Sequence, residues 1–301
     1  MSTALLLLGT LILRIRLIVT AHDVPALAQI TPDYIRLHKY RFSASIVRFG
    51  LRVIFLGFGL AGRRMIVHQQ SLADSLIRDY GVAAQKINVI PLATLPFALP
   101  VRAHARERLG LQPDGNYVLY FGFATGYKGI EALLEGMRLI GARTNEPPQL
   151  LLGAGYHPKK HDNADYADYY AALTSRSAEI SNVHHVGFIT DDRLDDYIAA
   201  CDVAIFPYVQ FQGMSGPLHQ CVSRGMPVLV SRPIADALDS VTDGSFNTTA
   251  EDIADVIMRF FGDSSFHDQV ATESQQLQGH LVESDAGAMT RRIYDEVLSE
   301  G

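Results

Sequence analysis

The chain has 301 residues, of which 48% are hydrophobic and 19% charged, with a net charge of -6. This length can hold two domains of ordinary size, and the composition is that of a folded, soluble α/β protein rather than a fibrous or disordered one. The two cysteines, Cys201 and Cys221, fit neither a disulfide framework nor a metal-ligand spacing, which predicts a reducing compartment and no metal site.

Charge is distributed unevenly along the chain. Residues 1–110 contain 14 Lys and Arg against 5 Asp and Glu, a balance of +9, and the remainder contains 12 against 27, a balance of -15. Arg52 lies among the apolar residues of the stretch 49–56, so we expect peripheral contact with an anionic membrane and no nucleic acid partner. Ordinary solvated charge is the alternative interpretation.

The N-terminal apolar run, Ala4–Leu13, is too short to span a bilayer. It lacks a preceding positive region, which argues against a signal peptide, although Val19-Thr20-Ala21 has the small residues of a cleavage site. We expect a buried or membrane-facing helix that leads into a short strand at 17–20, and a signal peptide is the alternative.

Short β-rich runs alternate with longer helical patterns, which is typical of parallel sheets built from βα units. Residues 94–114 contain three prolines and little periodicity, and predict an interdomain connection. In the first half the expected strands are 17–20, 64–67 and 87–90, and the expected helices are 45–60 and 69–80.

The second half shows the same alternation more clearly. Each strand ends in a turn-forming or polar segment, and ligands of open parallel sheets bind outside the carboxyl ends of the strands, so these segments are the site candidates. A helix is expected at 130–140 and a polar insertion at 157–170. The expected strands are 117–121, 150–152, one that ends at 185–188, 202–207 and 227–231.

A loop with a lysine follows the first of these strands. It runs from Gly122 to Lys128-Gly129 and precedes the expected helix. A lysine at the mouth of a parallel sheet, beside a helix N-terminus, is well placed to neutralise a diphosphate. The alternative is a surface lysine that caps a loop.

A second polar segment follows the strand at 202–207. It contains Ser215-Gly216-Pro217, and the stretch 217–224 is expected to form a helix whose first turn exposes the backbone N–H groups of Ser215 and Gly216. Such a helix start binds phosphate without a charged side chain. Gln220 lies one turn into this helix, where its side chain can reach a ribose hydroxyl.

In this order, the segments resemble the retaining glycosyltransferases of the family-four type, the glycosyl transferases of group 1. That resemblance implies the GT-B type of α/β fold, with two facing Rossmann-like domains. It covers about residues 15–280, and an ordered series of weak motifs is more specific than any single one. The matching segments are Thr20-Ala21-His22-Asp23, Val67-His68, residues 86–91, Lys128-Gly129, Gly153-Ala154-Gly155, Val183 with Gly187, Ala200-Cys201-Asp202-Val203 with Pro207, and Gly225-Met226-Pro227-Val228.

The resemblance also implies a division into domains. Residues 1–95 would form a partial, acceptor-side N-terminal domain, 96–114 a linker, and 115–280 the nucleotide-sugar-binding domain. A C-terminal helix at 281–301 would pack back on the N-terminal domain. The opening strand and Gly-rich loop of an ordinary N-terminal domain have no counterpart, so this domain is expected to be truncated.

The sequence departs from the family at two important positions. Counting back from Gly225 places Gln212 and Gln220 where the family has its two glutamates. An amide keeps one acceptor oxygen and adds donors, but it loses the negative charge. We therefore expect nucleotide binding to persist and turnover to be slow.

The resemblance implies a retaining, hexosyltransferase-type enzyme. It would move a sugar from a nucleotide-diphosphate donor to a saccharide or lipid-linked acceptor, without a cofactor, in the cytoplasm or on the inner face of the cell membrane. The alternatives are a non-catalytic nucleotide-sugar-binding or regulatory homologue, and an enzyme of the same architecture with different chemistry, such as an epimerase. His68 and His219 are expected to be structural or incidental. The catalytic candidates are His22, Lys128 and Gln212, and the donor-binding candidates are Gly122, Lys128, Gly153, Gly155, Ser215, Gly216, Pro217 and Gln220.

Overall fold

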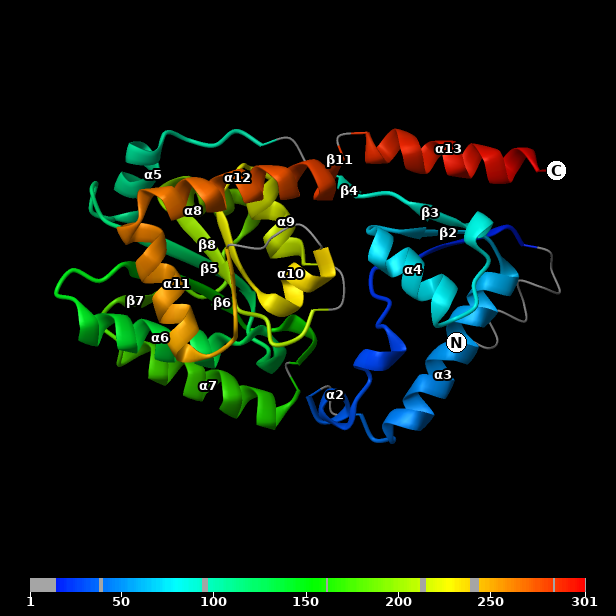
Figure 1. Ribbon diagram of the computed structural model, residues 1–301, viewed down its shortest axis with the longest axis horizontal. Helices are drawn as coiled ribbons and strands as arrows, with labels where there is room; N and C mark the ends of the chain where they lie inside the picture. The colour runs from blue at the N-terminus through cyan, green and yellow to red at the C-terminus, as the bar shows by residue number, and fades with distance from the viewer. Residues whose placement is uncertain are drawn as a thin grey trace. The chain divides into compact units, whose positions relative to one another are not determined.

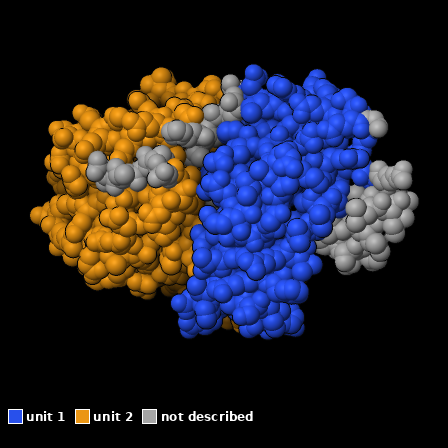
Figure 2. Space-filling model, turned by 45° about the vertical axis from the view of Figure 1, so that its right-hand side comes forward, with its two compact units in different colours: residues 1–94, 212–214, 280–301 blue, residues 95–211, 215–279 orange. Residues whose placement is uncertain are grey.

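The chain forms two compact units, which are coloured separately in Figure 2. Unit 1 comprises residues 1–94, 212–214 and 280–301, and unit 2 comprises residues 95–211 and 215–279. The expected N-terminal apolar run and Gln212 lie outside the described residues. The computed structural model describes residues 15–37, 40–93, 97–160, 162–211, 215–238, 244–283 and 285–300.

Unit 1 is built on a parallel sheet of three strands in the order β1-β2-β3 (Figure 1). The strands are β1 (Leu17–Thr20), β2 (Gly62–Val67) and β3 (Ile87–Val89), so the three strands expected in this half are confirmed. The remaining elements of unit 1 are η1 (Leu27–Gln29), α2 (Pro32–Leu37), α3 (Ala44–Ala61), α4 (Gln70–Arg78), η2 (Ala84–Lys86), β4 (Leu92–Ala93), β11 (Val282–Glu283) and α13 (Ala286–Ser299).

Alternate residues of β2 point to opposite faces of this sheet and pack into separate clusters. Met65 and Val67 belong to a core cluster that also contains Phe55 of α3. Ile66 belongs to a second cluster, together with Ile293 of α13. Helix α3 therefore covers one face of the sheet and α13 covers the other.

Unit 2 contains a parallel sheet of six strands in the order β10-β9-β8-β5-β6-β7 (Figure 1). The chain runs outward from β5 through β6 to β7, then returns to β8 beside β5 and runs outward on the other side. The order therefore reverses between β5 and β8, and this reversal is the point at which open α/β sheets bind ligands. The strands are β5 (Tyr117–Phe123), β6 (Gln149–Gly155), β7 (Val183–His185), β8 (Val203–Phe206), β9 (Val228–Ser231) and β10 (Ser245–Phe246).

Helices accompany these strands in the alternation that the sequence predicts. Helix α6 packs against α11, and α5 packs against α8. Both cysteines are buried as free thiols. The helices of unit 2 are α5 (Arg102–Leu109), η3 (Gly126–Lys128), α6 (Ile130–Arg143), η4 (Pro158–Lys160), α7 (Ala164–Ala178), α8 (Asp191–Ala200), α9 (Gly216–Ser223), α10 (Arg232–Leu238), α11 (Ala250–Gly262) and α12 (Ser264–Leu281), whose last two residues belong to unit 1.

The connection expected at 94–114 contains a helix, α5, that the lack of apolar periodicity did not predict. Polar contacts of one residue hold it in place: Arg106 is 5% exposed and donates from Nε to the carbonyl of Ala200 at 2.9 Å. Its Nη2 forms an ion pair with Asp202 at 3.2 Å. Because the anchor is a buried guanidinium, the segment carries no hydrophobic signal of a packed helix.

Two further expectations differ from the structure. The strand expected to reach 185–188 ends at His185, because Gly187 adopts φ of +72°, which breaks extended backbone. The insertion expected at 157–170 is instead the start of a packed helix, α7. The hydroxyl of Tyr166 donates to the carbonyl of Ala124 at 2.7 Å and accepts from the N–H of His157 at 2.9 Å, which fixes α7 to the end of β5.

Candidate functional site

The loops that follow β5 and β8 are held together at the reversal of the sheet. The N–H of Val209 donates to the carbonyl of Tyr127 at 2.8 Å. Gly129 adopts φ of +67°, and a Cβ at this position would lie 1.9 Å from the carbonyl oxygen of Pro207. Only glycine allows the two loops to approach this closely, which gives the Lys-Gly pair of the sequence a physical reason.

Lys128 is buried in this loop pair, with 7% of its surface exposed. A Cβ built on Gly122 would lie 2.8 Å from Nζ of Lys128 and 3.3 Å from Cγ of Pro217, so the ammonium lies between the end of β5 and the first turn of α9. No carboxylate among the described residues forms an ion pair with it. Burial lowers the pKa of Lys128 from 10.5 to about 8.

Tyr208 connects the lysine to the start of α9. Its ring centre lies 5.4 Å from Nζ of Lys128, a cation–π distance. Its hydroxyl is 3.0 Å from Oγ of Ser215, and its carbonyl accepts from the hydroxyl of Ser231 at 2.6 Å. The sequence did not single out Tyr208, because a buried aromatic residue after a strand has the same pattern as an ordinary core residue.

The first turn of α9 offers one free backbone donor among the described residues. Oγ of Ser215 accepts from the N–H of Leu218 at 3.2 Å, and the carbonyl of Ser215 accepts from the N–H of His219 at 2.9 Å. Pro217 has no N–H. The N–H of Gly216 remains, and Gly216 is exposed, so the helix start expected here presents a backbone donor to solvent at Gly216.

Gln220 does not present its oxygen to solvent. Oε1 of Gln220 accepts from Nη1 of Arg224, whose Nε forms an ion pair with Asp195 at 2.6 Å. An arginine has donors only, so the atom that faces it must be the amide oxygen. The amide nitrogen of Gln220 is therefore the group left for a ligand.

Gly153 and Gly155 of β6 have packing reasons to be glycine. A Cβ on Gly153 would lie 2.7 Å from Cδ1 of Ile189, and one on Gly155 would lie 2.7 Å from Cδ2 of Phe188. Phe188 is 57% exposed and stacks on Phe123, the last residue of β5, with ring centres 5.7 Å apart. Gly155 therefore leaves room for the aromatic pair at the carboxyl edge of the sheet, and Gly153 leaves room for Ile189.

His22 lies in unit 1, two residues after the end of β1, and pairs with a histidine just after the end of β2. Nδ1 of His22 is 2.9 Å from Nε2 of His68, and Nδ1 of His68 is 2.8 Å from the carbonyl of Ile90. A carbonyl only accepts, so His68 carries a proton on Nδ1, and burial lowers the pKa of the imidazole, which favours its neutral form. Nε2 of His68 then accepts from His22, which leaves Nε2 of His22 as a free acceptor.

The predicted site residues thus fall into separate groups. Gly122, Lys128, Ser215, Gly216 and Pro217 come together at the ends of β5 and β8. His68, which was expected to be structural, contacts the candidate His22 in unit 1. Within the described ranges, no three His, Cys, Asp or Glu side chains gather in a way that could hold a metal ion.

Several known proteins share this architecture. Residues 115–263, which lie in unit 2 except for residues 212–214, match the model of the family Glycosyl transferases group 1. Anabaena HepE, solved in complex with UDP and glucose, superimposes with a TM-score of 0.71 at 17% identity, over 99% of this chain and 75% of HepE. The GT-B fold class expected from the sequence is confirmed.

Two curated relatives are similar over part of their length. An uncharacterized glycosyltransferase of Methanocaldococcus jannaschii, MJ1607, is 25% identical over 174 residues, which is 56% of this chain and 42% of that protein. D-inositol 3-phosphate glycosyltransferase 2 of Catenulispora acidiphila is 26% identical over 191 residues, 62% of this chain and 44% of that protein. The chain therefore spans less than half the length of these relatives.

Proposed function

We propose that unit 2 binds a nucleotide-diphosphate sugar at the ends of β5 and β8, and that the protein transfers the sugar, with retention, to a saccharide or lipid-linked acceptor. The observation that carries this proposal is the buried ammonium of Lys128. It has no anionic partner among the described residues and lies beside the start of α9. A buried, unpaired charge destabilises a fold, and a bound diphosphate would offset that cost.

The reaction needs stabilisation of the leaving group. As the bond between the sugar and the diphosphate breaks, negative charge builds up on the diphosphate oxygens. Lys128 and the N–H of Gly216 would donate to these oxygens, and the dipole of α9 would add to the effect. UDP is the nucleotide to test first, because HepE was solved with it.

The nucleobase would stack on the exposed aromatic edge. Phe188 presents an open ring supported by Phe123, at the same carboxyl edge as Lys128. Aromatic stacking contributes about 1–3 kcal/mol per base in nucleic-acid-binding proteins. We propose that Phe188 holds the base and that Gln220 donates from its amide nitrogen to a ribose hydroxyl.

On the acceptor side, we propose that His22 acts through its free Nε2. The pairing with His68 fixes the tautomer of His22, so this nitrogen accepts a hydrogen bond or a proton from a hydroxyl. We also propose that Gln212 lies near the transferred sugar, where a carboxylate would support the cationic transition state better than an amide.

Calorimetry with UDP tests the donor site. Lys128→Ala should weaken UDP binding by about 1.5–3 kcal/mol, the size of a charge-assisted hydrogen bond. The matched control is Arg138→Ala, which removes one exposed positive charge from α6 and should leave UDP affinity unchanged. Equal UDP affinity in the wild type and in Lys128→Ala would remove Lys128 from the site.

Turnover separates an enzyme from a non-catalytic homologue. The assay measures release of nucleoside diphosphate from a panel of nucleotide sugars, with saccharide and lipid acceptors. Transfer by the wild type supports the proposal, and UDP binding without any transfer supports a binding or regulatory role. Gln212→Glu should raise a slow rate if the amide is a weakened substitute for a carboxylate.

A further inference from the structure

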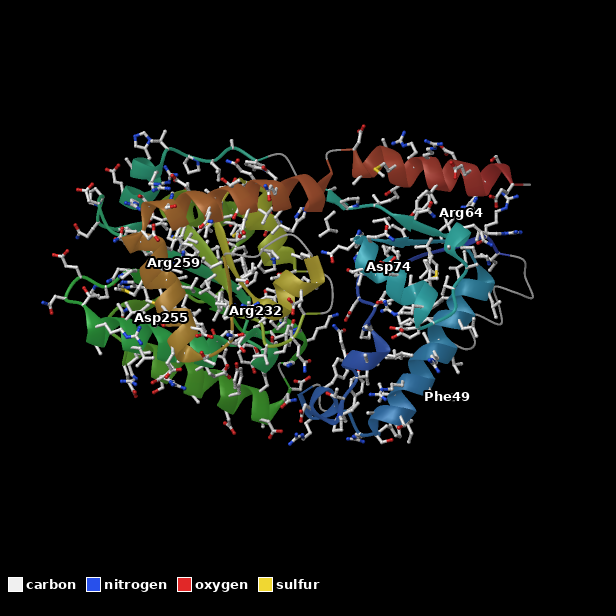
Figure 3. All side chains as sticks on the ribbon, in the orientation of Figure 1. Phe49, Arg64, Asp74, Arg232, Asp255 and Arg259 are labelled. Carbon is white, nitrogen blue, oxygen red and sulfur yellow. The ribbon has the colours of Figure 1, made fainter. Side chains whose placement is uncertain are left out.

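Helix α3 presents an apolar stripe to the outside of unit 1. The stripe lies opposite the face that packs against β2, and its residues are spaced alternately three and four apart, as on one side of a helix. Phe49 lies on the outer side of α3 (Figure 3). The exposed fractions are 56% for Ile46, 70% for Phe49, 54% for Val53, 42% for Leu56 and 68% for Leu60.

A basic recess adjoins this stripe. It has a volume of about 420 Å³ and is lined by Leu27, Ala28, Ser45, Arg48, Phe49 and Arg52. Arg48 donates from Nε and Nη2 to the carbonyl of Ile30, at 3.0 and 2.7 Å, and Arg52 donates from Nε to the carbonyl of Asp79 at 3.2 Å. Neither guanidinium forms an ion pair with a carboxylate among the described residues, so both keep unused donors and an uncompensated charge.

The surrounding sequence is strongly basic. Residues 34–73 contain six arginines and one lysine, and no Asp or Glu. An apolar stripe beside uncompensated arginines is complementary to a surface that is apolar inside and anionic outside.

We infer that α3 docks on the surface of an anionic phospholipid bilayer. Phe49 and the rest of the stripe enter the acyl region, and a lipid phosphate binds Arg48 and Arg52 in the recess. This contact belongs to unit 1 and is independent of the donor site of unit 2.

Two other occupants fit the structure less well. By length and composition, with a mean hydropathy of 1.7 over 18 residues, α3 could cross a membrane. However, Phe55 of α3 is buried in the core of unit 1, which a spanning helix would have to abandon. A second copy of the chain, docked stripe to stripe, would bring two sets of Arg48 and Arg52 together without a counter-charge.

The chain contains no tryptophan, so a single introduced tryptophan reports insertion. Phe49→Trp should show a blue shift of its emission with vesicles that contain equal parts of phosphatidylglycerol and phosphatidylcholine. No shift is expected with phosphatidylcholine alone, and rising salt should reverse the shift. Leu298→Trp is the matched control. Leu298 is 65% exposed on α13, which covers the opposite face of the sheet, so its emission should not change.

Vesicle sedimentation of further variants tests each part of the surface. Phe49→Ser should lower the vesicle affinity about tenfold or more, and Arg52→Gln about fivefold, the effect of one basic residue near an anionic surface. Leu298→Ser should have no effect. Unchanged melting temperatures would show that the variants remain folded.

Several results would overturn the inference. One is an unchanged tryptophan emission of the Phe49→Trp variant with anionic vesicles, and another is equal binding of the protein to neutral and anionic vesicles. A third is an emission shift of Phe49→Trp that glycerophosphoglycerol produces without vesicles. A lipid-free dimer whose formation requires Phe49 would assign the stripe to a second copy. Resistance to extraction by high salt and alkali would assign α3 to a membrane span.

Discussion

The carboxyl edges of the two sheets both carry polar groups, but these groups differ in whether they have charge or hydrogen-bond partners. In unit 2, Lys128 is buried beside Tyr208 and has no anionic partner among the described residues. In unit 1, both ring nitrogens of His68 are bonded, one to Ile90 and one to His22. An unsatisfied buried charge indicates a site that a ligand completes, whereas a satisfied buried imidazole indicates a support that orients its neighbour.

Because of this difference, removal of each group should change the stability of the protein in the opposite direction. At the edge of unit 2, the group proposed to bind the ligand opposes folding, so its removal should stabilise the protein and weaken binding. At the edge of unit 1, the supporting histidine contributes to the fold, so its removal should lower both stability and transfer. Substitutions at each edge test this contrast.

The largest effect is expected from Gly129→Ala. The added Cβ would lie 1.9 Å from the carbonyl oxygen of Pro207, at a φ of +67°. The loops after β5 and β8 would have to separate, and we expect a loss of about 3 kcal/mol or more in the free energy of unfolding, together with loss of UDP binding. Urea denaturation measures the first and calorimetry the second.

Gly262→Ala is the matched control for this substitution. Gly262 lies at the end of α11, and a Cβ there would meet nothing within 4 Å, so stability should be unchanged or slightly higher. If Gly129→Ala is as stable as this control, the close approach of the two loops has no energetic importance.

Lys128→Met should have opposite effects on stability and binding. Burial lowers the lysine pKa from 10.5 to about 8, which corresponds to about 3 kcal/mol of destabilisation at neutral pH. The apolar replacement should therefore raise the free energy of unfolding at pH 7 and weaken UDP binding by at least tenfold. A variant that loses stability would show that the ammonium has a partner that stabilises it.

The same pKa sets the pH dependence of the wild type. Below pH 8 the lysine is protonated in both the folded and the unfolded state, and the folded state bears the full cost of burial. Between about pH 8 and 10.5 the folded state releases the proton first, so this contribution to stability should rise with pH. UDP affinity should fall over the same range as the ammonium is lost. In Lys128→Met, neither this rise in stability with pH nor this fall in UDP affinity should be seen.

His68→Ala should have a smaller effect, which falls mainly on transfer. The substitution leaves the carbonyl of Ile90 without its donor and releases the tautomer of His22, so we expect about 1–2 kcal/mol less stability and about tenfold to a hundredfold slower transfer. UDP affinity should not change. His68→Gln, which can bond to both partners, should recover part of the rate. A variant with normal transfer would make His68 purely structural.

The residues that come together at the candidate site could largely be predicted from the sequence for unit 2, but hardly at all for unit 1. Lys128-Gly129 and Ser215-Gly216 follow buried strands, and strand ends of a parallel sheet meet at one edge, so their proximity follows from chain order. The partnership of His22 and His68 depends on the pairing of Thr20 with Ile66 in neighbouring strands, which apolar patterning does not specify.

Side-chain contacts between segments that are distant in the sequence also could not be predicted from it. Oε1 of Gln220 accepts from Arg224, which is itself fixed by Asp195 of another helix, and no local pattern indicates this. The helix α5 was missed for the same reason, since Arg106 is held by Asp202, which is far away in the sequence.

The smallest effect is expected from Gln220→Glu. The amide oxygen is engaged by Arg224, so the free amide nitrogen is the group proposed to bind ribose. A carboxylate keeps the contact with Arg224 and removes that donor, and it also places a negative charge near the diphosphate. Both changes weaken UDP binding, by about 1 kcal/mol in total, the size of one hydrogen bond at a partly exposed site.

A comparison of UDP with pyrophosphate separates these two contributions. Gln220→Met removes the donor without adding charge, so it should weaken UDP binding as Gln220→Glu does but leave pyrophosphate affinity unchanged. Gln220→Glu should weaken pyrophosphate binding only by its charge, an effect that salt reduces. Tighter UDP binding by Gln220→Glu would show that the site prefers a carboxylate acceptor. In that case the ribose hydroxyl donates to residue 220, and the bond to Arg224 gives way when the nucleotide binds.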